Sequence, residues 1–93
     1  MATLHLPERL THQEASACLA QLTRDMPAAG GDVSLDASAL LQFDSSALAV
    51  LLACQRAAQA RGCALQVVGL PPKAQQLAKV YGVAPWLQRA AQA

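Results

Sequence analysis

The side chains of this chain that could do chemistry gather in the stretch Asp44-Ser45-Ser46, which directly precedes the apolar run Ala47–Cys54. Asp and Ser side chains accept hydrogen bonds from the unpaired amides of a first helical turn, so the stretch predicts a helix N-cap. The same position presents hydroxyl groups at the positive end of a helix dipole, which favours an added phosphate, whereas Asp44 opposes one. Three uses remain open for this stretch: capping alone, phosphorylation, and docking of another protein.

No catalytic arrangement accompanies these hydroxyls in the sequence. Ser45 and Ser46 have no base nearby in the chain, and His5 and His12 lie in the N-terminal segment without the spacing of a metal site. A paired-carboxylate role for Asp36 lacks a His, Lys or Arg within the motif to complete an acid–base pair. We expect Asp36 to stabilise a turn instead. The sequence therefore predicts a protein that is not an enzyme and that uses no metal or other cofactor.

The elements that must position this stretch are a strand before it and a helix after it. Apolar and polar residues alternate over Asp32–Ala37, which predicts a strand, and the chain reverses over residues 38–44. A helix follows over roughly Ser45–Arg61, and a third strand over Cys63–Gly69. A strand, a crossover helix and a strand imply parallel pairing with a right-handed connection.

The flanking segments complete an alternation of strands and helices. Ala2–Leu6 predicts a short edge strand, and the pair Thr11 and Glu14 matches a capping box at the start of a helix. Ala74–Gly82 predicts a last helix, followed by a final turn that packs Trp86 near the core. Apolar stripes at helical spacing mark both of these helices: Ala15, Cys18, Leu19, Leu22 and Met26, then Ala74, Leu77, Ala78 and Tyr81.

The run Ala47–Cys54 is apolar around its whole circumference. Such a helix is either buried on every side or covered by another molecule, and full burial is hard to arrange in a small domain. The outer side of this run, with Ala49, is therefore a candidate protein-binding patch, together with Leu40 and Leu41 in the preceding loop. The alternative is that alanines such as Ala49 are ordinary surface residues.

Size and charge narrow the class of protein. The 93 residues suit one domain, expected over residues 1–93, and 7 basic against 6 acidic residues leave no electrostatic footprint for nucleic acid or an anionic membrane. The start of the chain lacks the pattern of a signal peptide, and its longest apolar run is too short to cross a membrane. Cys18, Cys54 and Cys63 form no CxxC pair. We expect a soluble cytoplasmic protein whose cysteines are small buried hydrophobes.

The order of these segments resembles a STAS domain over nearly the whole chain. The most specific part is Asp44-Ser45-Ser46-Ala47-Leu48, which is similar to the family's Asp-Ser/Thr-Ser/Ala-Gly-Leu, with Ala47 in place of the usual glycine. Alanine is a good helix former, so a helical site tolerates this difference. The resemblance implies an α/β STAS fold with a small mixed sheet of four or nearly four strands and helices packed mainly on one face.

The resemblance also implies a function in protein–protein interaction. The family includes the bacterial anti-sigma-factor antagonists, in which a serine at the position of Ser46 is phosphorylated by a partner kinase. It also includes the small cytoplasmic subunit of the Mla-type phospholipid ABC transporter, in which the hydroxyl residue after the Asp, here Ser45, contacts the ATPase. Ser45 is a second candidate phosphate acceptor. Together with the apolar patch, the expected partner-binding residues are Leu40, Leu41, Asp44, Ser45, Ser46 and Ala49.

The expected partner is the ATPase subunit of such a transporter, because Leu77–Val83 also resembles the third helix of the transporter branch. That partner would hold the chain at the inner membrane without direct membrane insertion. The alternative partner is an anti-sigma factor with serine-kinase activity.

Overall fold

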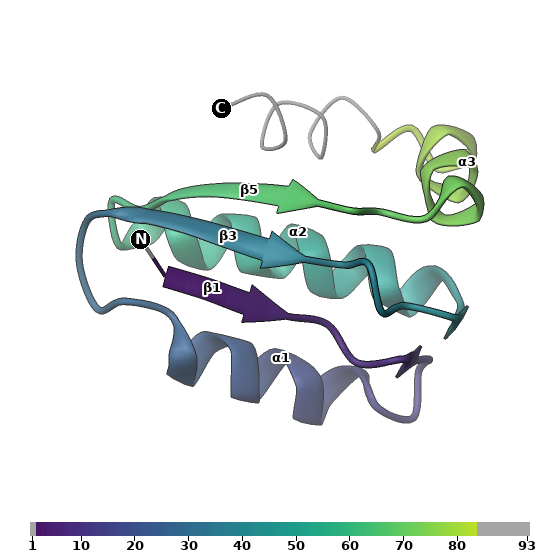
Figure 1. The fold of residues 1–93 in the computed structure, drawn as a ribbon, viewed down its shortest axis with the longest axis horizontal. Coiled ribbons are helices and arrows are strands. Elements are labelled where there is room, and N and C mark those ends of the chain that lie inside the picture. The colour runs from purple at the N-terminus through teal and green to yellow at the C-terminus, as the bar shows by residue number, and fades with distance from the viewer. Residues whose placement is uncertain (1, 84–93) are drawn as a thin grey trace.

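The computed structural model describes residues 2–83 (Figure 1). The main sheet contains β1 (Ala2–His5), β3 (Asp32–Asp36) and β5 (Ala64–Val68), and a second sheet contains β2 (Arg9–Leu10) and β4 (Gln42–Phe43). The helices are α1 (Ala15–Asp25), α2 (Ser45–Ala60) and α3 (Pro72–Val80). The final turn expected around Trp86 lies outside the described residues.

The main sheet has the strand order β1-β3-β5, and both of its strand pairs are parallel. Val33 in the central strand pairs with Ala2 on one side and Leu65 on the other. The predicted parallel pairing across α2 is confirmed, and so is the α/β fold class. The expected mixed sheet of about four strands is instead a three-stranded parallel sheet in the described residues. Pro7 ends the pairing of β1 because proline has no amide hydrogen to donate.

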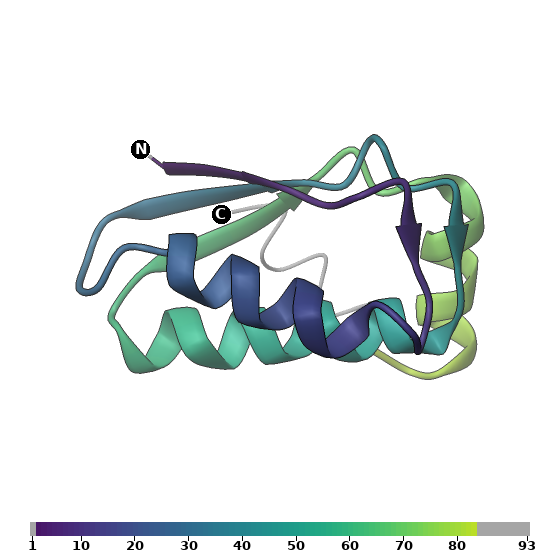
Figure 2. The same ribbon diagram turned by 90° about the horizontal axis from the view of Figure 1, so that it is seen from below.

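The helices α1 and α2 lie side by side on one face of the main sheet (Figure 2). Alternate strand residues point toward them, and this alternation buries Leu4, Leu35 and Val67 while His5 stays exposed. Leu51 of α2 has no exposed surface and belongs to the core. The predicted packing of helices mainly on one face holds for α1 and α2.

The apolar start of α2 is mostly core. Within Ala47–Cys54 only Ala49 is exposed, while Leu52 and Ala53 are half-buried. The sheet and α1 cover the helix more completely than the sequence suggested, because α1 packs along its length. The apolar patch expected on α2 is therefore reduced to Ala49 and its half-buried neighbours.

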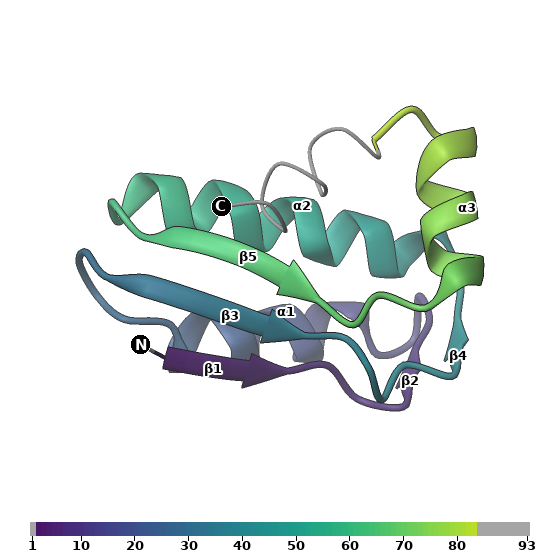
Figure 3. The same ribbon diagram turned by 45° about the horizontal axis from the view of Figure 1, so that its top comes forward.

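Helix α3 lies at the end of the sheet to which its three strands point (Figures 1 and 3). Ala74 and Ala78 are buried, as the apolar stripe predicted. The same prediction is wrong for Tyr81, which is 58% exposed. The reason is that α3 ends at Val80 and the chain turns away at Gly82, whose φ of 73° is in the left-handed region that glycine favours.

All three cysteines are free thiols. Cys54 and Cys63 are buried, whereas Cys18 is half-buried. Burial raises the pKa of the Cys54 thiol to about 11. Cys54 and Cys63 therefore act as small hydrophobic residues, as predicted, and Cys18 does so only in part.

Candidate functional site

The turn at Asp44 has the geometry of a helix N-cap. The Asp44 backbone is extended, and its carboxylate Oδ1 accepts a hydrogen bond from the Ser46 amide at 2.8 Å. The Ala47 amide donates to the Asp44 carbonyl oxygen at 3.0 Å. Two of the amides that a helix leaves unpaired at its start are thus satisfied by one residue, which confirms the predicted cap.

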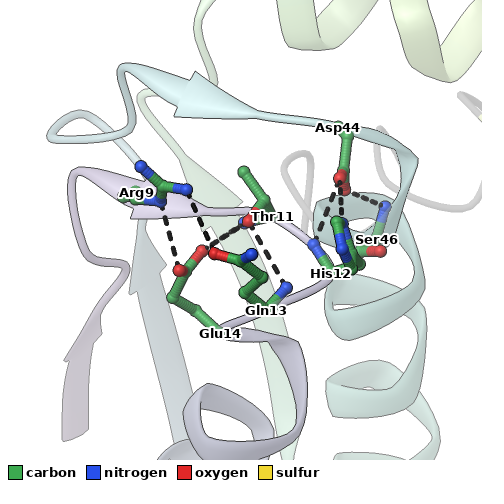
Figure 4. Close-up of polar contacts among 7 residues, drawn as sticks. All are labelled: Arg9, Thr11, His12, Gln13, Glu14, Asp44 and Ser46. Carbon is green, nitrogen blue, oxygen red and sulfur yellow. Dashed lines mark hydrogen bonds and ion pairs between the residues drawn. The ribbon is translucent and has the colours of Figure 1, made fainter.

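The second carboxylate oxygen of Asp44 reaches a different part of the chain (Figure 4). Oδ2 accepts the His12 amide at 3.1 Å and lies 3.4 Å from Nδ1 of the His12 ring. Hydrogen bonds from the Ser46 amide, and then from the His12 amide, hold the pKa of the Asp44 carboxyl below its usual value. Asp44 therefore stays ionised at neutral pH and ties the turn before α1 to the start of α2.

The small sheet of β2 and β4 brings these two segments together. Arg9 pairs with Gln42 and Leu10 pairs with Phe43. The Leu41 and Gln42 amides both donate to the Glu8 carbonyl oxygen, at 2.8 and 2.9 Å. Because Leu10 has no exposed surface, it anchors this sheet in the core. The position of Asp44 is thus set by a strand pair rather than by a flexible loop.

The turn before α1 is held by Glu14. Its Oε1 accepts the Thr11 amide at 2.9 Å and the Thr11 hydroxyl at 2.7 Å, while Arg9 Nε donates to Oε2 at 3.1 Å (Figure 4). The Thr11 donors, with a smaller contribution from Arg9, hold the pKa of the Glu14 carboxyl below its usual value. The capping-box pair forms, but α1 begins only at Ala15, so the pair fixes the turn that carries His12.

The exposure of the predicted binding residues divides them into two groups. Leu41 is 70% exposed, and Ser45 and Ala49 are exposed as well. Ser46 and Asp44 are partly buried. Leu40 is only 2% exposed, so its predicted place on the surface is wrong. It points into the core because the loop amide of Leu40 bonds to the Ala37 carbonyl oxygen and turns the two leucines apart.

A second aspartate turn lies at the end of β3. Asp36 Oδ1 accepts the Ser38 amide at 2.9 Å, and Ser38 holds the pKa of the Asp36 carboxyl below its usual value. The predicted role of Asp36 in turn stabilisation is confirmed. Gly69 approaches this turn closely, because a Cβ atom on it would lie 3.0 Å from the Ser38 Cβ.

The Asp44 turn presents a carboxylate and two serine residues at the start of α2. Among the hydrogen bonds of residues 2–83, His12 reaches Asp44 and neither serine hydroxyl. No group of three or more His, Cys, Asp or Glu residues in the same part of the chain could hold a metal ion. Within the described residues, no helix has both the length and the apolar character needed to cross a membrane.

Sequence reasoning missed His12 as a member of this site. His12 and Asp44 are 32 positions apart in the sequence, and β2 and β4, the strands that bring their segments together, are two residues long. Two residues are too few to give an alternating pattern. The Thr11 and Glu14 pair is a signal in this segment, but its spacing predicts the start of a helix and not a contact with Asp44.

Comparison with known proteins identifies one family. The family model described as "Mlab, STAS domain" matches residues 1–88, which is most of the chain. A search of curated proteins found no match, and a search of solved structures found none either.

Proposed function

Because the chain belongs to the MlaB-type STAS domain family, we propose that it is an accessory subunit that binds the ATPase of an Mla-type phospholipid ABC transporter. STAS domains are in general non-catalytic modules with a protein-interaction or regulatory role. On this proposal the chain does no chemistry of its own. It works in the cytoplasm and is held at the inner membrane through its partner.

The observation that carries the proposal is an exposed leucine beside a fixed polar turn. Leu41 is 70% exposed. Its backbone amide donates to the Glu8 carbonyl oxygen, and this bond holds the loop so that the side chain stays at the surface. Ser45 and Ala49 lie one helical turn apart on α2 and are both exposed. An apolar contact surrounded by hydroxyl and carboxylate groups fits the anatomy of a protein interface, which has an apolar core and a polar rim.

A binding measurement with the purified ATPase subunit of such a transporter tests this proposal. Leu41→Asp and Ser45→Arg should each weaken binding about tenfold or more, because they place a charge in the contact. Ala20→Asp and Ser16→Arg are matched controls, since both positions are exposed on α1. The controls should bind as the wild type does. Unchanged binding by both site variants would remove the Asp44 turn from the interface.

The alternative is an anti-sigma-factor antagonist that is controlled by phosphorylation of Ser46, with Ser45 as the second acceptor. One observation favours it: Ser46 is partly exposed in the first turn of α2, where the helix dipole stabilises an anion. A second observation opposes it: the ionised Asp44 carboxylate already accepts the hydrogen bond of the Ser46 amide. A phosphate on Ser46 would be repelled by that carboxylate.

The two alternatives separate on one pair of variants. If phosphorylation controls docking, Ser46→Asp should abolish binding to a serine-kinase anti-sigma factor while Ser46→Ala preserves it. Under the transporter proposal, both variants should bind the ATPase with similar affinity, because Ser46 is the less exposed of the two serines. Loss of ATPase binding by Ser46→Asp alone would favour phosphoregulation.

A further inference from the structure

The outer side of α3 is a second exposed surface that the Asp44 turn does not include. Val80 is 81% exposed and the adjacent Tyr81 is 58% exposed. Lys73, Gln76 and Lys79 are also exposed. Helical spacing places Lys73 and Gln76 in one stripe with Val80, and Lys79 lies one turn from Gln76 at the edge of that stripe. The inner side of this helix is already packed through Ala74 and Ala78. The surface therefore combines a bare aliphatic side chain with two ammonium groups.

The charge is unevenly divided along the sequence. All 6 acidic residues lie at or before Asp44. Among the 49 residues from Ser45 to Ala93, every charged residue is basic. The salt bridges within residues 2–83 involve Arg9 and the two histidines, and neither lysine of α3. The positive charge of Lys73 and Lys79 is thus not neutralised by any acidic residue of the described structure.

The α3 surface and the Asp44 turn lie at the same end of the molecule. In all three views, α3 is found with β2 and β4 at the end to which the main strands point (Figures 1, 2 and 3). Leu41 directly precedes β4. A single partner of ordinary size that contacts Leu41 and Ser45 can therefore also reach α3.

We infer that the partner docked at the Asp44 turn also binds the outer side of α3, through an acidic protein surface that surrounds an apolar contact for Val80. This inference rests on the proposed function for the identity of the partner. Charge complementarity selects the occupant, because the α3 surface offers two cations and no anion. An anionic lipid surface is the weaker match, since lipid-binding segments gather about four to eight basic residues and α3 has two.

The test measures the dissociation constant of the full chain for the purified ATPase subunit by calorimetry, at low and at high salt. Lys73→Glu with Lys79→Glu should weaken binding about tenfold or more at low salt, and Val80→Asp should also weaken it. The neutral pair Lys73→Gln with Lys79→Gln should lose most of the salt dependence. Arg24→Glu is the matched control, because Arg24 is an exposed cation near the far end of α1 and should bind as the wild type. Thermal unfolding of each variant shows that it is folded.

The outcomes distinguish this inference from the proposed function. If Leu41→Asp weakens binding and the α3 variants do not, the inference is overturned and the proposed function stands. If the wild-type chain does not bind the ATPase at all, both fail. If the wild type binds phosphatidylglycerol vesicles and the Glu pair does not, while ATPase binding is unchanged in that pair, α3 contacts a membrane and the inference is overturned.

Discussion

Two aspartates of this chain make the same local hydrogen bond and yet begin different structures. Asp36 accepts the amide of the residue two positions later at 2.9 Å, and Asp44 does so at 2.8 Å. Each carboxylate also lies near a histidine ring, at 3.7 Å from His5 and 3.4 Å from His12. The Asp36 turn nevertheless leads into a loop, whereas the Asp44 turn leads into the 16 residues of α2.

The difference lies in the second oxygen of each carboxylate. At Asp44 this oxygen accepts a backbone amide, that of His12, from a segment far away in the sequence. At Asp36 this oxygen accepts no backbone amide among residues 2–83 and lies 3.7 Å from Nδ1 of the His5 ring. The local bond is therefore common to both turns, and of the two only Asp44 also makes the long-range backbone bond. On the proposed function this bond favours docking, because an interface gains affinity from groups that are already fixed.

The Asp36 turn should be destabilised by an added side chain at Gly69, which packs against it. The substitution Gly69→Ala tests this, and it has the largest effect on stability that we expect. An alanine there adopts a φ of 71° and meets the Ser38 Cβ at 3.0 Å and the Ser38 amide nitrogen at 3.2 Å. Gly62→Ala is the matched control, since its φ is 70° and nothing lies within 4 Å of the added carbon. Urea unfolding should show a loss of about 1–2 kcal/mol for the control.

Gly69→Ala should lose about 1 kcal/mol more than that control, because the contact adds to the backbone strain. The folded fraction should still bind the partner, because the Asp44 turn is untouched. Equal losses in the two variants would show that the loop at Ser38 moves aside freely, and that the Asp36 turn is not held in place by its neighbours.

Removing each carboxylate compares the two turns directly. Asp44→Ala should lower the melting temperature by several degrees and weaken partner binding, because it removes a helix cap and the bond to His12 together. Asp36→Ala should lower it less and leave binding unchanged, since its bond closes a short turn outside the site. Thermal unfolding and calorimetric binding of both variants give the comparison. Equal binding losses would mean that the second oxygen of Asp44 has no special role.

The features of the two turns that depend on neighbouring residues could be predicted from the sequence. The residue types predicted both turns, because Asp and Ser cap helices and stabilise turns, and the apolar run after Asp44 predicted the helix that one of them caps. Strand alternation indicated the sheet and its buried face, and helical spacing indicated the apolar stripes of α1 and α3. These signals are strong because each spans several residues of one element.

The part that depends on contacts between distant segments could not be predicted. Leu40 and Leu41 are identical residues in one loop, yet one is 2% and the other 70% exposed, because the backbone turns between them. Likewise, β2 and β4 have two residues each, so neither carries a pattern of its own. The bond between His12 and Asp44 depends on that strand pair and was invisible for the same reason.

The acid stability of the protein should depend more on Asp44 than on Asp36. The pKa of each carboxyl is lowered in the folded state, so each ionised group contributes stability that is fully present above the unfolded pKa, about 3.9, and is lost as the pH falls through the folded pKa. Asp44→Asn keeps a good N-cap residue and removes the titration. Its stability should fall less steeply than that of the wild type below about pH 4.

Asp36→Asn should flatten the same acid limb by a smaller amount, since Asp36 accepts one backbone amide and Asp44 accepts two. Urea unfolding between pH 7 and pH 3 measures both slopes, with Asp25→Asn as a control because its carboxylate is exposed and bonds only to a glutamine side chain among the described residues. If the free energy of unfolding falls more steeply with acid in Asp44→Asn than in Asp36→Asn, then Asp36 contributes more to acid stability than Asp44.

We expect the smallest effect from removing the histidine rings. This change separates the contribution of each ring from that of the backbone amide. His12 is 77% exposed and His5 is 71% exposed, so each ring contributes little through its aspartate in water. His12→Ala keeps the backbone amide that bonds Asp44, and we expect the melting temperature to change by less than about 2 °C, as in His5→Ala. Partner binding should also persist in both variants. A loss in His12→Ala comparable to that in Asp44→Ala would mean that the ring, and not the chain segment carrying it, fixes the Asp44 turn.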